Sequence, residues 1–287
     1  MSSFGRRRSS GEYPDLLRTD AISNGTVTLF RNSANKVFGD RDEFAVSAEW
    51  LDPDEIQDAY ALVEEKERTL AAENAFAWSP DFGYLSPFPM HCGTGLVVQA
   101  SFHLEGLHII GDLPPVFSAL DALRFNCEGF TADGIVNAAY VFCIYNRSTI
   151  GMAERDLLAR VKRVFSDLAD QERTARKSLV EEHPVLLADA VERALATLRH
   201  ARLLSPIEYA DLLSPVYLAS LMGFIEGASA KKLWHTLRSQ LEKPMQRPPE
   251  TFEEERLRDG RDARFAGKVN AAFANVRLND RAKEILS

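Results

Sequence analysis

The stretch Phe82-Gly-Tyr-Leu-Ser-Pro-Phe-Pro-Met-His-Cys-Gly-Thr-Gly-Leu-Val-Val-Gln-Ala-Ser101 decides how the rest of the chain is interpreted. It turns on two prolines, crosses Gly93-Thr94-Gly95 and enters an apolar segment that reaches Leu104. Glycines beside a small hydroxyl allow close backbone approach, and spare N–H groups in such a turn can bind an anion. The same pattern is typical of a structural turn between two core strands. No Lys-Ser/Thr follows the glycines, so the stretch is not a P-loop.

Length and composition indicate a globular protein. The chain has 287 residues, of which 45% are hydrophobic and 26% are charged, enough for one large or two small domains. A net charge of -8 argues against a nucleic-acid partner. No apolar run approaches the roughly 18 residues of a membrane span, and no secretory signal is visible. Three cysteines without metal-site spacing predict reduced thiols and a cytoplasmic location.

Hydrophobic periodicity predicts the main elements. Alternating, β-rich stretches predict strands over residues 26–31, 43–50, 127–131 and 137–145. Apolar stripes predict helices over residues 52–75, 114–123, 153–181 and, in several pieces, beyond 184. Capping boxes are predicted at Asp52, Ser205 and Thr251. Strands mixed with helices come first and helices alone follow. This order favours an α+β fold with a mostly antiparallel sheet flanked by helices, and a helical C-terminal part.

Three blocks together resemble the ATP:guanidino phosphotransferases. Gly83-Tyr84-Leu85 followed by Gly93-Thr94-Gly95 resembles the family signature Gly-Tyr-Leu-Thr-Ser-Cys-Pro-Thr-Asn-x-Gly-Thr-Gly. The run Asn-Arg-Ser-Thr-Ile-Gly at 146–151 resembles the family's Asn-x-x-x-Leu-Gly helix entry. The run Gln-Glu-Arg-Thr-Ala-Arg at 171–176 resembles Gln-Glu-Arg-x-Ala-Arg of bacterial protein-arginine kinases. The resemblance implies a guanidino-kinase-type domain over 25–245, after a disordered tail at 1–13. A charged helical extension follows at 246–287, beyond a proline-rich linker.

The resemblance implies an activity and a set of groups. Such enzymes move the γ-phosphoryl of Mg-ATP onto a guanidinium nitrogen. Arginines clamp the phosphates, because the transition state spreads negative charge over oxygen atoms. Carboxylates orient the guanidinium, and a cysteine helps to position it.

The substrate positions of the family fall on residues that differ from its pattern. Counting back from Gly83 places Asp42 where the principal catalytic glutamate stands and Glu43 beside it, with Arg41 in place of a second carboxylate. The substrate cysteine falls on Phe88. The acid of the following flexible loop is matched by Asp133.

The phosphate-binding positions lack positive charge. The aligned arginines fall on Val46, Val97 and Glu128, whereas Gly93-Thr94-Gly95 is kept. The family's arginine-rich first strand finds no counterpart. Each charge-assisted contact of this kind is worth about 1.5–3 kcal/mol. We therefore expect no nucleotide cofactor and no metal.

Three hypotheses for the function follow. The first is a pseudoenzyme that binds an arginine-bearing or phosphoarginine-bearing protein, or that regulates an active kinase; a homodimer is left open. The second is an active protein-arginine kinase with relocated cations, for which Arg41, Arg124 and Arg147 are candidates. The third is a structural or assembly protein that keeps only the scaffold.

Other chemistries have weaker support. A zinc site could use His91, Cys92, His103 and His108, although their spacing fits no standard pattern. A hydrolase could use Ser86 or Ser101, although no nucleophile elbow is present. A cation site could use Asp40, Asp42 and Glu43, although a solvated strand edge is the favoured explanation.

Overall fold

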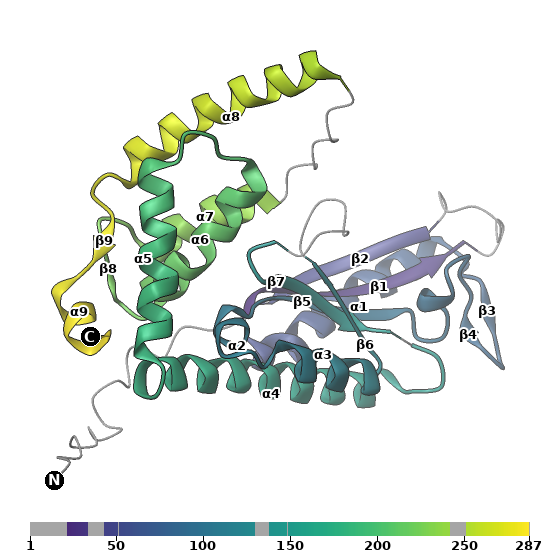
Figure 1. Cartoon of the computed structure of the whole chain (residues 1–287). Helices are drawn as coiled ribbons and strands as arrows, with labels where there is room; N and C mark the ends of the chain where they lie inside the picture. Colours follow the sequence, from purple (N-terminus) through teal and green to yellow (C-terminus); the bar gives the residue numbers. More distant parts are fainter. Residues whose placement is uncertain are drawn as a thin grey trace, which may run out of the picture. The chain divides into compact units, whose positions relative to one another are not determined.

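The computed structural model of the chain describes residues 22–33, 43–50, 52–129, 138–147, 149–241 and 251–286. The chain forms two compact units, a first unit over residues 21–172 and a second unit over residues 173–287 (Figure 1). The predicted tail at 1–13 and the centre of the predicted linker lie outside the described residues. The boundary between the units falls inside one long helix, which no change in composition marks.

The first unit contains a five-stranded sheet, a two-stranded hairpin and helices. Its strands are β1 (Ile22–Asn32), β2 (Glu43–Trp50), β3 (Trp78–Ser79), β4 (Gly83–Tyr84), β5 (Leu96–His103), β6 (Phe125–Gly129) and β7 (Val141–Asn146). Its helices are η2 (Pro53–Glu55), α1 (Ile56–Glu73), η3 (Pro89–His91), α2 (Glu105–Ile110), α3 (Leu113–Ala122) and most of α4 (Glu154–Glu181).

The strand order of the main sheet is β2-β1-β5-β7-β6, and every neighbouring pair is antiparallel. This confirms the predicted α+β class with an antiparallel sheet flanked by helices. The predicted strand at 137–145 is wrong at its start, because Ala139 and Tyr140 have positive φ values of 56° and 51° and form a turn before β7.

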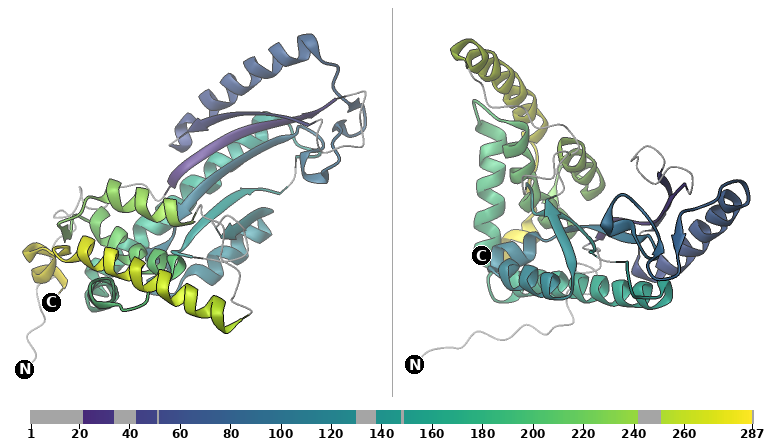
Figure 2. Two further views of the ribbon diagram at one scale, coloured as in Figure 1. Left: turned by 90° about the horizontal axis from the view of Figure 1, so that it is seen from above. Right: turned by 90° about the vertical axis from the view of Figure 1, so that its right-hand side faces the viewer.

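Strand pairing assigns each side chain to one of two faces, because directly opposite residues share a face. We call the first the Phe102 face. It carries Val27, Leu29, Arg31, Phe44, Val46, Ala48, Trp50, Leu96, Val98, Ala100, Phe102, Phe125, Cys127, Phe142, Ile144 and Asn146. The ring of Phe165 from α4 packs there against Trp50, Phe102 and Phe125, with centroids 5.4–6.0 Å apart. Helices α1, α3 and α4 lie along this side of the sheet (Figures 1 and 2).

We call the second the Val97 face. It carries Thr26, Thr28, Phe30, Asn32, Ala45, Ser47, Glu49, Val97, Gln99, Ser101, His103, Asn126, Glu128, Val141, Cys143 and Tyr145. Several of these side chains are buried, including Val97, Ser101 and His103.

The helices of the first unit follow the predicted apolar stripes. The capping box at Asp52 is confirmed, since its side chain accepts from Asp54 N and the Glu55 side chain accepts from Asp52 N. In α4, the predicted stripe is buried at all seven positions, namely Leu157, Val161, Val164, Phe165, Leu168, Ala175 and Leu179. Burying such a stripe, rather than helix propensity, is what stabilises a helix of this kind.

The second unit is helical apart from one short β-pair. It contains the end of α4, then α5 (Pro184–His200), α6 (Pro206–Leu221), β8 (Ile225–Glu226), α7 (Ala230–Leu241), α8 (Phe252–Phe273), β9 (Arg277–Leu278) and α9 (Asp280–Leu286). Helix α5 packs on α6 and on α8. Ser205 and Thr251 cap α6 and α8 as predicted. No described helix has the length and apolarity that crossing a membrane would require.

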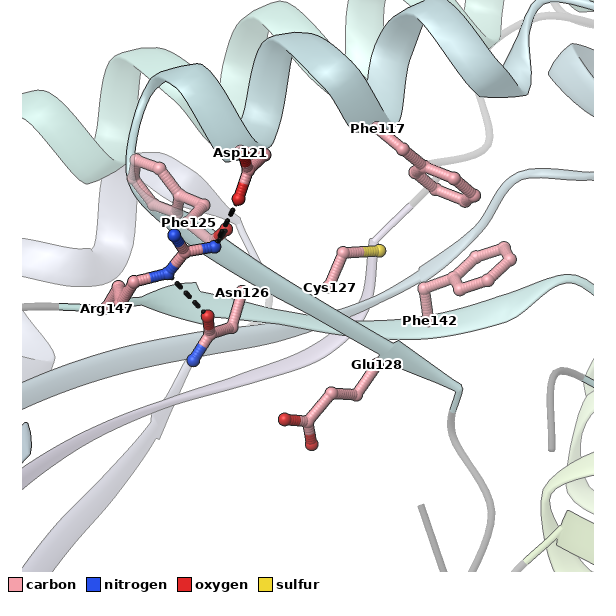
Figure 3. Close-up of a pocket in the computed structure, with 8 residues that line it drawn as sticks. All are labelled: Phe117, Asp121, Phe125, Asn126, Cys127, Glu128, Phe142 and Arg147. Carbon is pink, nitrogen blue, oxygen red and sulfur yellow. Dashed lines mark hydrogen bonds and ion pairs between the residues drawn. The ribbon is translucent and has the colours of Figure 1, made fainter. Parts of the chain in front are cut away.

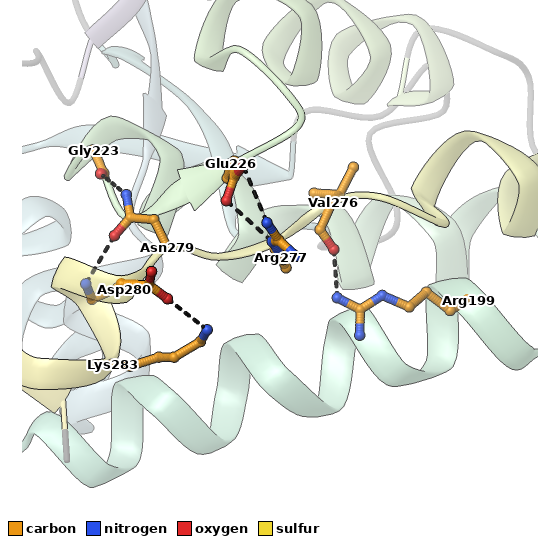
Figure 4. A network of polar contacts seen from close by, with 9 residues as sticks. Arg199, Gly223, Glu226, Val276, Arg277, Asn279, Asp280 and Lys283 are labelled. Carbon is orange, nitrogen blue, oxygen red and sulfur yellow. Dashed lines mark hydrogen bonds and ion pairs between the residues drawn. The ribbon is translucent and has the colours of Figure 1, made fainter.

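The C-terminal segment is tied to the rest of the second unit by polar contacts (Figure 4). Arg277 pairs with Glu226 at 3.1 Å, and Asn279 donates to the carbonyl of Gly223 at 2.8 Å. Arg199 of α5 donates to the carbonyl of Val276. These bonds connect the segment between α8 and α9 to α5 and to the residues before α7 within this unit.

Candidate functional site

The Gly-Thr-Gly stretch lies at the junction of three chain segments. Gly93 and Gly95 have φ values of 90° and 61°, which favour glycine. A Cβ atom at Gly93 would lie 2.4 Å from the carbonyl oxygen of Thr149, and one at Gly95 would lie 2.4 Å from that of Phe30. Both glycines are therefore required by close backbone packing inside the protein.

The N–H groups of this turn are used within the protein. Gly93 N donates to the carbonyl of Tyr84 at 2.9 Å, and Tyr84 N donates back to Gly93 at the same distance. Thr94 N donates to the carbonyl of Thr149 at 3.0 Å. Of the two roles left open by the sequence, this geometry favours the structural turn, because these two N–H groups are not available to an anion in this conformation.

The buried side chain of Arg31 holds the Gly-Thr-Gly turn in place. Arg31 is 4% exposed, and its Nε donates to the Glu67 carboxylate at 2.8 Å. Its Nη1 donates to the carbonyls of Thr94 at 2.8 Å and of Phe30 at 2.9 Å. Its guanidinium carbon lies 3.6 Å from the centroid of the Tyr84 ring, a cation–π contact. The Arg31 side chain thereby links strand β1 to helix α1 and to the Phe82–Ser101 stretch.

Sequence reasoning missed this Arg31–Glu67–Tyr84 cluster, although a signal was present. Glu67 falls on the apolar stripe of α1, four residues after Val63, where a carboxylate needs a partner if it is buried. Arg31 alternates with the inward-facing Val27 and Leu29 of β1.

The two other blocks that resemble the family also have structural roles. Asn146 is 3% exposed, and its amide accepts from Val98 N at 2.8 Å and donates to the carbonyl of Leu96 at 3.0 Å. This side chain continues the pairing of β5 and β7 beyond the end of β7. Glu172 is fully buried, and its carboxylate accepts from Gly106 N and Leu107 N at 2.9 and 3.0 Å. A carboxylate on these N–H groups stabilises the first turn of α2.

The positions aligned with the phosphate arginines do not converge. Val46 lies on the Phe102 face, 8% exposed and opposite Leu29, whereas Val97 and Glu128 lie on the Val97 face. Glu128 shares a row with Cys143 and Ser101, four residues along the strand from Val97, which is about 13 Å. On β2, the residues that share a face with Val97 are Ala45, Ser47 and Glu49.

The position aligned with the substrate cysteine lies beside an aromatic stack. The ring of Phe30, on the Val97 face, stacks on His91 with centroids 3.6 Å apart. Phe88 meets His91 edge to face at 5.5 Å and is 41% exposed. The thiol of Cys92 points to the carbonyls of Ser86 at 3.4 Å and Phe88 at 3.8 Å. Aromatic side chains therefore occupy the place where the resemblance implies a cysteine that positions the substrate.

A cavity of the first unit lies along β6 (Figure 3). It has a volume of about 330 Å³ and is lined by Phe117, Asp121, Phe125, Asn126, Cys127, Glu128, Phe142 and Arg147. Arg147 donates to Asp121 at 2.6 Å and to the Asn126 side chain at 2.8 Å. Arg147, one of the cations proposed for relocation, is thus already paired, and Arg124 contributes its carbonyl to Arg147 N at 3.0 Å.

The titratable groups around Glu128 are held in their neutral forms. Burial, with the Cys143 and Glu128 charges, raises the pKa of the Cys127 thiol to about 12. Burial and Glu128 raise the pKa of Cys143 to about 11. Burial and the hydrogen bond that its hydroxyl donates to Glu128, at 2.5 Å, raise the pKa of Tyr145 to about 12. Neither thiol is therefore a nucleophile at neutral pH.

Some predicted site residues cannot be placed. Asp40, Arg41, Asp42 and Asp133 lie outside the described residues, and Glu43 is the first residue of β2. The catalytic and substrate roles implied for Asp42, Glu43 and Asp133 stay predictions, as does a cation site at the acidic run.

The alternative chemistries gain no support from the part of the chain that the structure describes. No group of three or more His, Cys, Asp or Glu side chains is arranged there for a metal ion. His91 stacks on Phe30, and His108 stacks on Tyr140 at 3.5 Å. Ser101 is 4% exposed, and the Ser86 hydroxyl accepts from Phe88 N at 3.0 Å.

Comparisons with known proteins agree with the resemblance. Residues 51–175 match the family described as ATP:guanido phosphotransferase, C-terminal catalytic domain. A protein-arginine kinase from Syntrophomonas wolfei is 30% identical over 220 residues, which is 77% of this chain and 61% of that protein. One from Moorella thermoacetica is 33% identical over 150 residues, which is 52% of this chain and 43% of that protein.

The chain covers about half the length of most of these curated relatives. Among solved structures, the duplicated taurocyamine kinase from Schistosoma mansoni aligns over 76% of this chain and 43% of its own, with 11% identity. The TM-score of this alignment is 0.44. The family match and the curated relatives show that this chain contains a domain of the ATP:guanido phosphotransferase catalytic family.

Proposed function

We propose that this chain is a guanidino-kinase-type scaffold that acts by binding a protein partner and not by phosphoryl transfer. The observation that carries the proposal is the composition of the Val97 face. None of the sixteen strand side chains named above for this face, all within the described residues, is Arg or Lys, and two are glutamates, Glu49 and Glu128. The resemblance implies phosphate contacts on this face, at Val97 and Glu128.

The chemistry of phosphoryl transfer explains why this matters. Its transition state spreads charge over the transferred oxygens, and catalysis is mostly positioning and cationic stabilisation. Each arginine–phosphate contact is worth about 1.5–3 kcal/mol, so two or three missing contacts lower nucleotide affinity by several orders of magnitude. Arg147, just beyond β7, is neutralised by Asp121 and held by Asn126.

The residues that match the family motifs also support the proposal, because their contacts are structural. Gly93, Asn146 and Glu172 make backbone contacts that the fold needs whether or not a ligand binds. A chain that keeps these residues while its aligned phosphate positions carry Val and Glu fits a scaffold retained for binding. The partner class that the family chemistry suggests is a protein bearing arginine or phosphoarginine.

Nucleotide binding is the decisive measurement. Thermal unfolding of the full chain should be unchanged by Mg-ATP or Mg-ADP at millimolar concentration, since a ligand that binds only the folded state raises the melting temperature by mass action. The Syntrophomonas wolfei protein-arginine kinase, run alongside, serves as the positive control. A melting temperature that rises with nucleotide concentration, or arginine phosphorylation detected by mass spectrometry, would refute the proposal.

A further inference from the structure

Strand β6 lies at one end of the main sheet, and within the described ranges of the chain β7 is its single strand neighbour. Arg147 N donates to the carbonyl of Arg124, which fixes the alternation of the antiparallel ladder. By this alternation, Asn126 and Glu128 bond to β7, whereas the backbone groups of Phe125, Cys127 and Gly129 point away from it. The carbonyl of Phe125 accepts from Arg147 at 3.3 Å. The N–H and C=O of Cys127 are therefore directed outward, in the arrangement that another strand can pair with.

The cavity of about 330 Å³ runs along this same edge. On the Phe102 face it is apolar, with the rings of Phe117 and Phe142 in edge contact at 4.9 Å and the thiol of Cys127 directed toward them (Figure 3). An unionised thiol beside two phenyl rings is a surface for an apolar side chain.

On the Val97 face the same edge is acidic. Glu128 is exposed and forms no ion pair with any Lys, Arg or His within the described ranges. The charge of Arg147 is already neutralised by Asp121, and Figure 3 shows the Glu128 carboxylate pointing away from that pair. A cation arriving beside β6 on this face meets a net negative charge.

We propose that β6 is a docking edge for an extended segment of a partner protein in which an arginine alternates with apolar residues. Added as a strand, such a segment would place its arginine beside Glu128 and its neighbouring apolar side chain in the cavity beside Phe117. Main-chain bonds supply affinity in this binding mode, and alternate side chains supply specificity. The inference rests on the proposed function only for the class of partner. Docking at β6 and its cavity does not depend on whether the chain binds a nucleotide.

The test uses the full chain and a fluorescein-labelled nonapeptide, Thr-Val-Thr-Val-Arg-Val-Thr-Val-Thr, followed by fluorescence anisotropy. The peptide should bind, and Glu128→Gln should weaken binding about two- to five-fold, the range for an opposite-charge cross-strand pair. Replacing the peptide arginine with citrulline should have the same effect on the original chain and none on the Glu128→Gln variant. The matched control is Glu49→Gln, an exposed glutamate on the same face of the opposite edge strand β2, which should leave binding unchanged.

A second peptide tests strand pairing on the original chain, without any substitution in the protein. Methylating the backbone nitrogens of alternate residues removes the donors needed for strand pairing and should abolish binding. Absence of binding by the first peptide, equal binding of the methylated peptide, or equal effects of Glu49→Gln and Glu128→Gln would overturn the docking edge. A chain that binds the peptide and also Mg-ATP would refute the proposed function and leave the docking edge standing.

Discussion

Replacing Arg31 with Met would remove the cation that joins β1, α1 and the Gly-Thr-Gly turn. The variant loses the 2.8 Å bond to Glu67, the bonds to the carbonyls of Thr94 and Phe30, and the contact with the Tyr84 ring. The side chains of the ion pair are 4% and 12% exposed, so solvent cannot replace what is lost. Met keeps most of the apolar stem, and the change therefore isolates the charge and its hydrogen bonds.

The expected loss of unfolding free energy is about 3–5 kcal/mol, the range for removing one partner of a buried ion pair. The double variant Arg31→Met/Glu67→Leu should recover much of this, because no buried charge remains unpaired. It should stay about 1–3 kcal/mol below the original chain, since the carbonyl of Thr94 still lacks a donor. Together with the single Glu67→Leu variant, these two variants form a double-mutant cycle that measures the coupling of the pair.

Urea unfolding followed by tryptophan fluorescence measures this in the right part of the chain. In a Trp234→Phe background, the remaining tryptophans, Trp50 and Trp78, both report on the first unit. The control is Arg68→Met, which breaks an exposed Arg–Glu pair of α1 in the same unit, where a small change is expected. If Arg31→Met costs less than about 1 kcal/mol, or no more than Arg68→Met, Arg31 does not hold the turn as described above.

Three further changes test other features. Gly93→Ala should lower the melting temperature far more than Gly151→Ala. Both glycines have positive φ, but only a Cβ atom at Gly93 would lie 2.4 Å from a carbonyl oxygen. Equal effects on the melting temperature would show that the turn relaxes freely. Burial raises the pKa of Cys127 to about 12 and of Cys143 to about 11 from the ordinary 9.0. The unfolded chain then loses these protons first, so stability should fall as pH rises above about 9. The double Cys→Ala variant should show a shallower fall in urea titrations, and an unchanged slope would contradict the shifts. Ser205→Ala should cost about 1 kcal/mol by removing the cap of α6, checked by thermal unfolding against Ser205→Asp, which should retain most of the stability.

The sequence predicted elements well where a local pattern is sufficient. Helix α4 was found because its apolar stripe repeats from Leu157 to Leu179, and the helical start before α1 because Asp52 begins a complete capping box. The beginning of β7 was misjudged for a physical reason. Ala139 and Tyr140 are apolar like the strand that follows, but Leu104 N bonds to the Tyr140 carbonyl and His108 stacks on its ring. Those partners are more than 30 residues away, and composition cannot reveal them.

The candidate site was harder to predict, because a motif fixes spacing but not which way a side chain points. Counting from Gly83 put Val46 among the phosphate positions, yet pairing with Leu29 turns it toward α1. A shift of one residue moves a side chain to the opposite face of a sheet, so neighbouring positions in a sequence can belong to different sites. Arg31 and Glu67 are 36 residues apart and became partners only when β1 and α1 were packed.

The fully buried carboxylate of Glu172 has a consequence for how motifs of this kind are used to infer activity. Glu172 lies in a sequence motif that resembles one found in an enzyme family, yet its carboxylate oxygens accept hydrogen bonds from the backbone N–H groups of Gly106 and Leu107. Natural selection for a folded chain alone would preserve it, even after every turnover had ceased. Similarity at such structural residues therefore indicates common ancestry. Only the residues that would contact the reactants can indicate whether catalytic activity is retained.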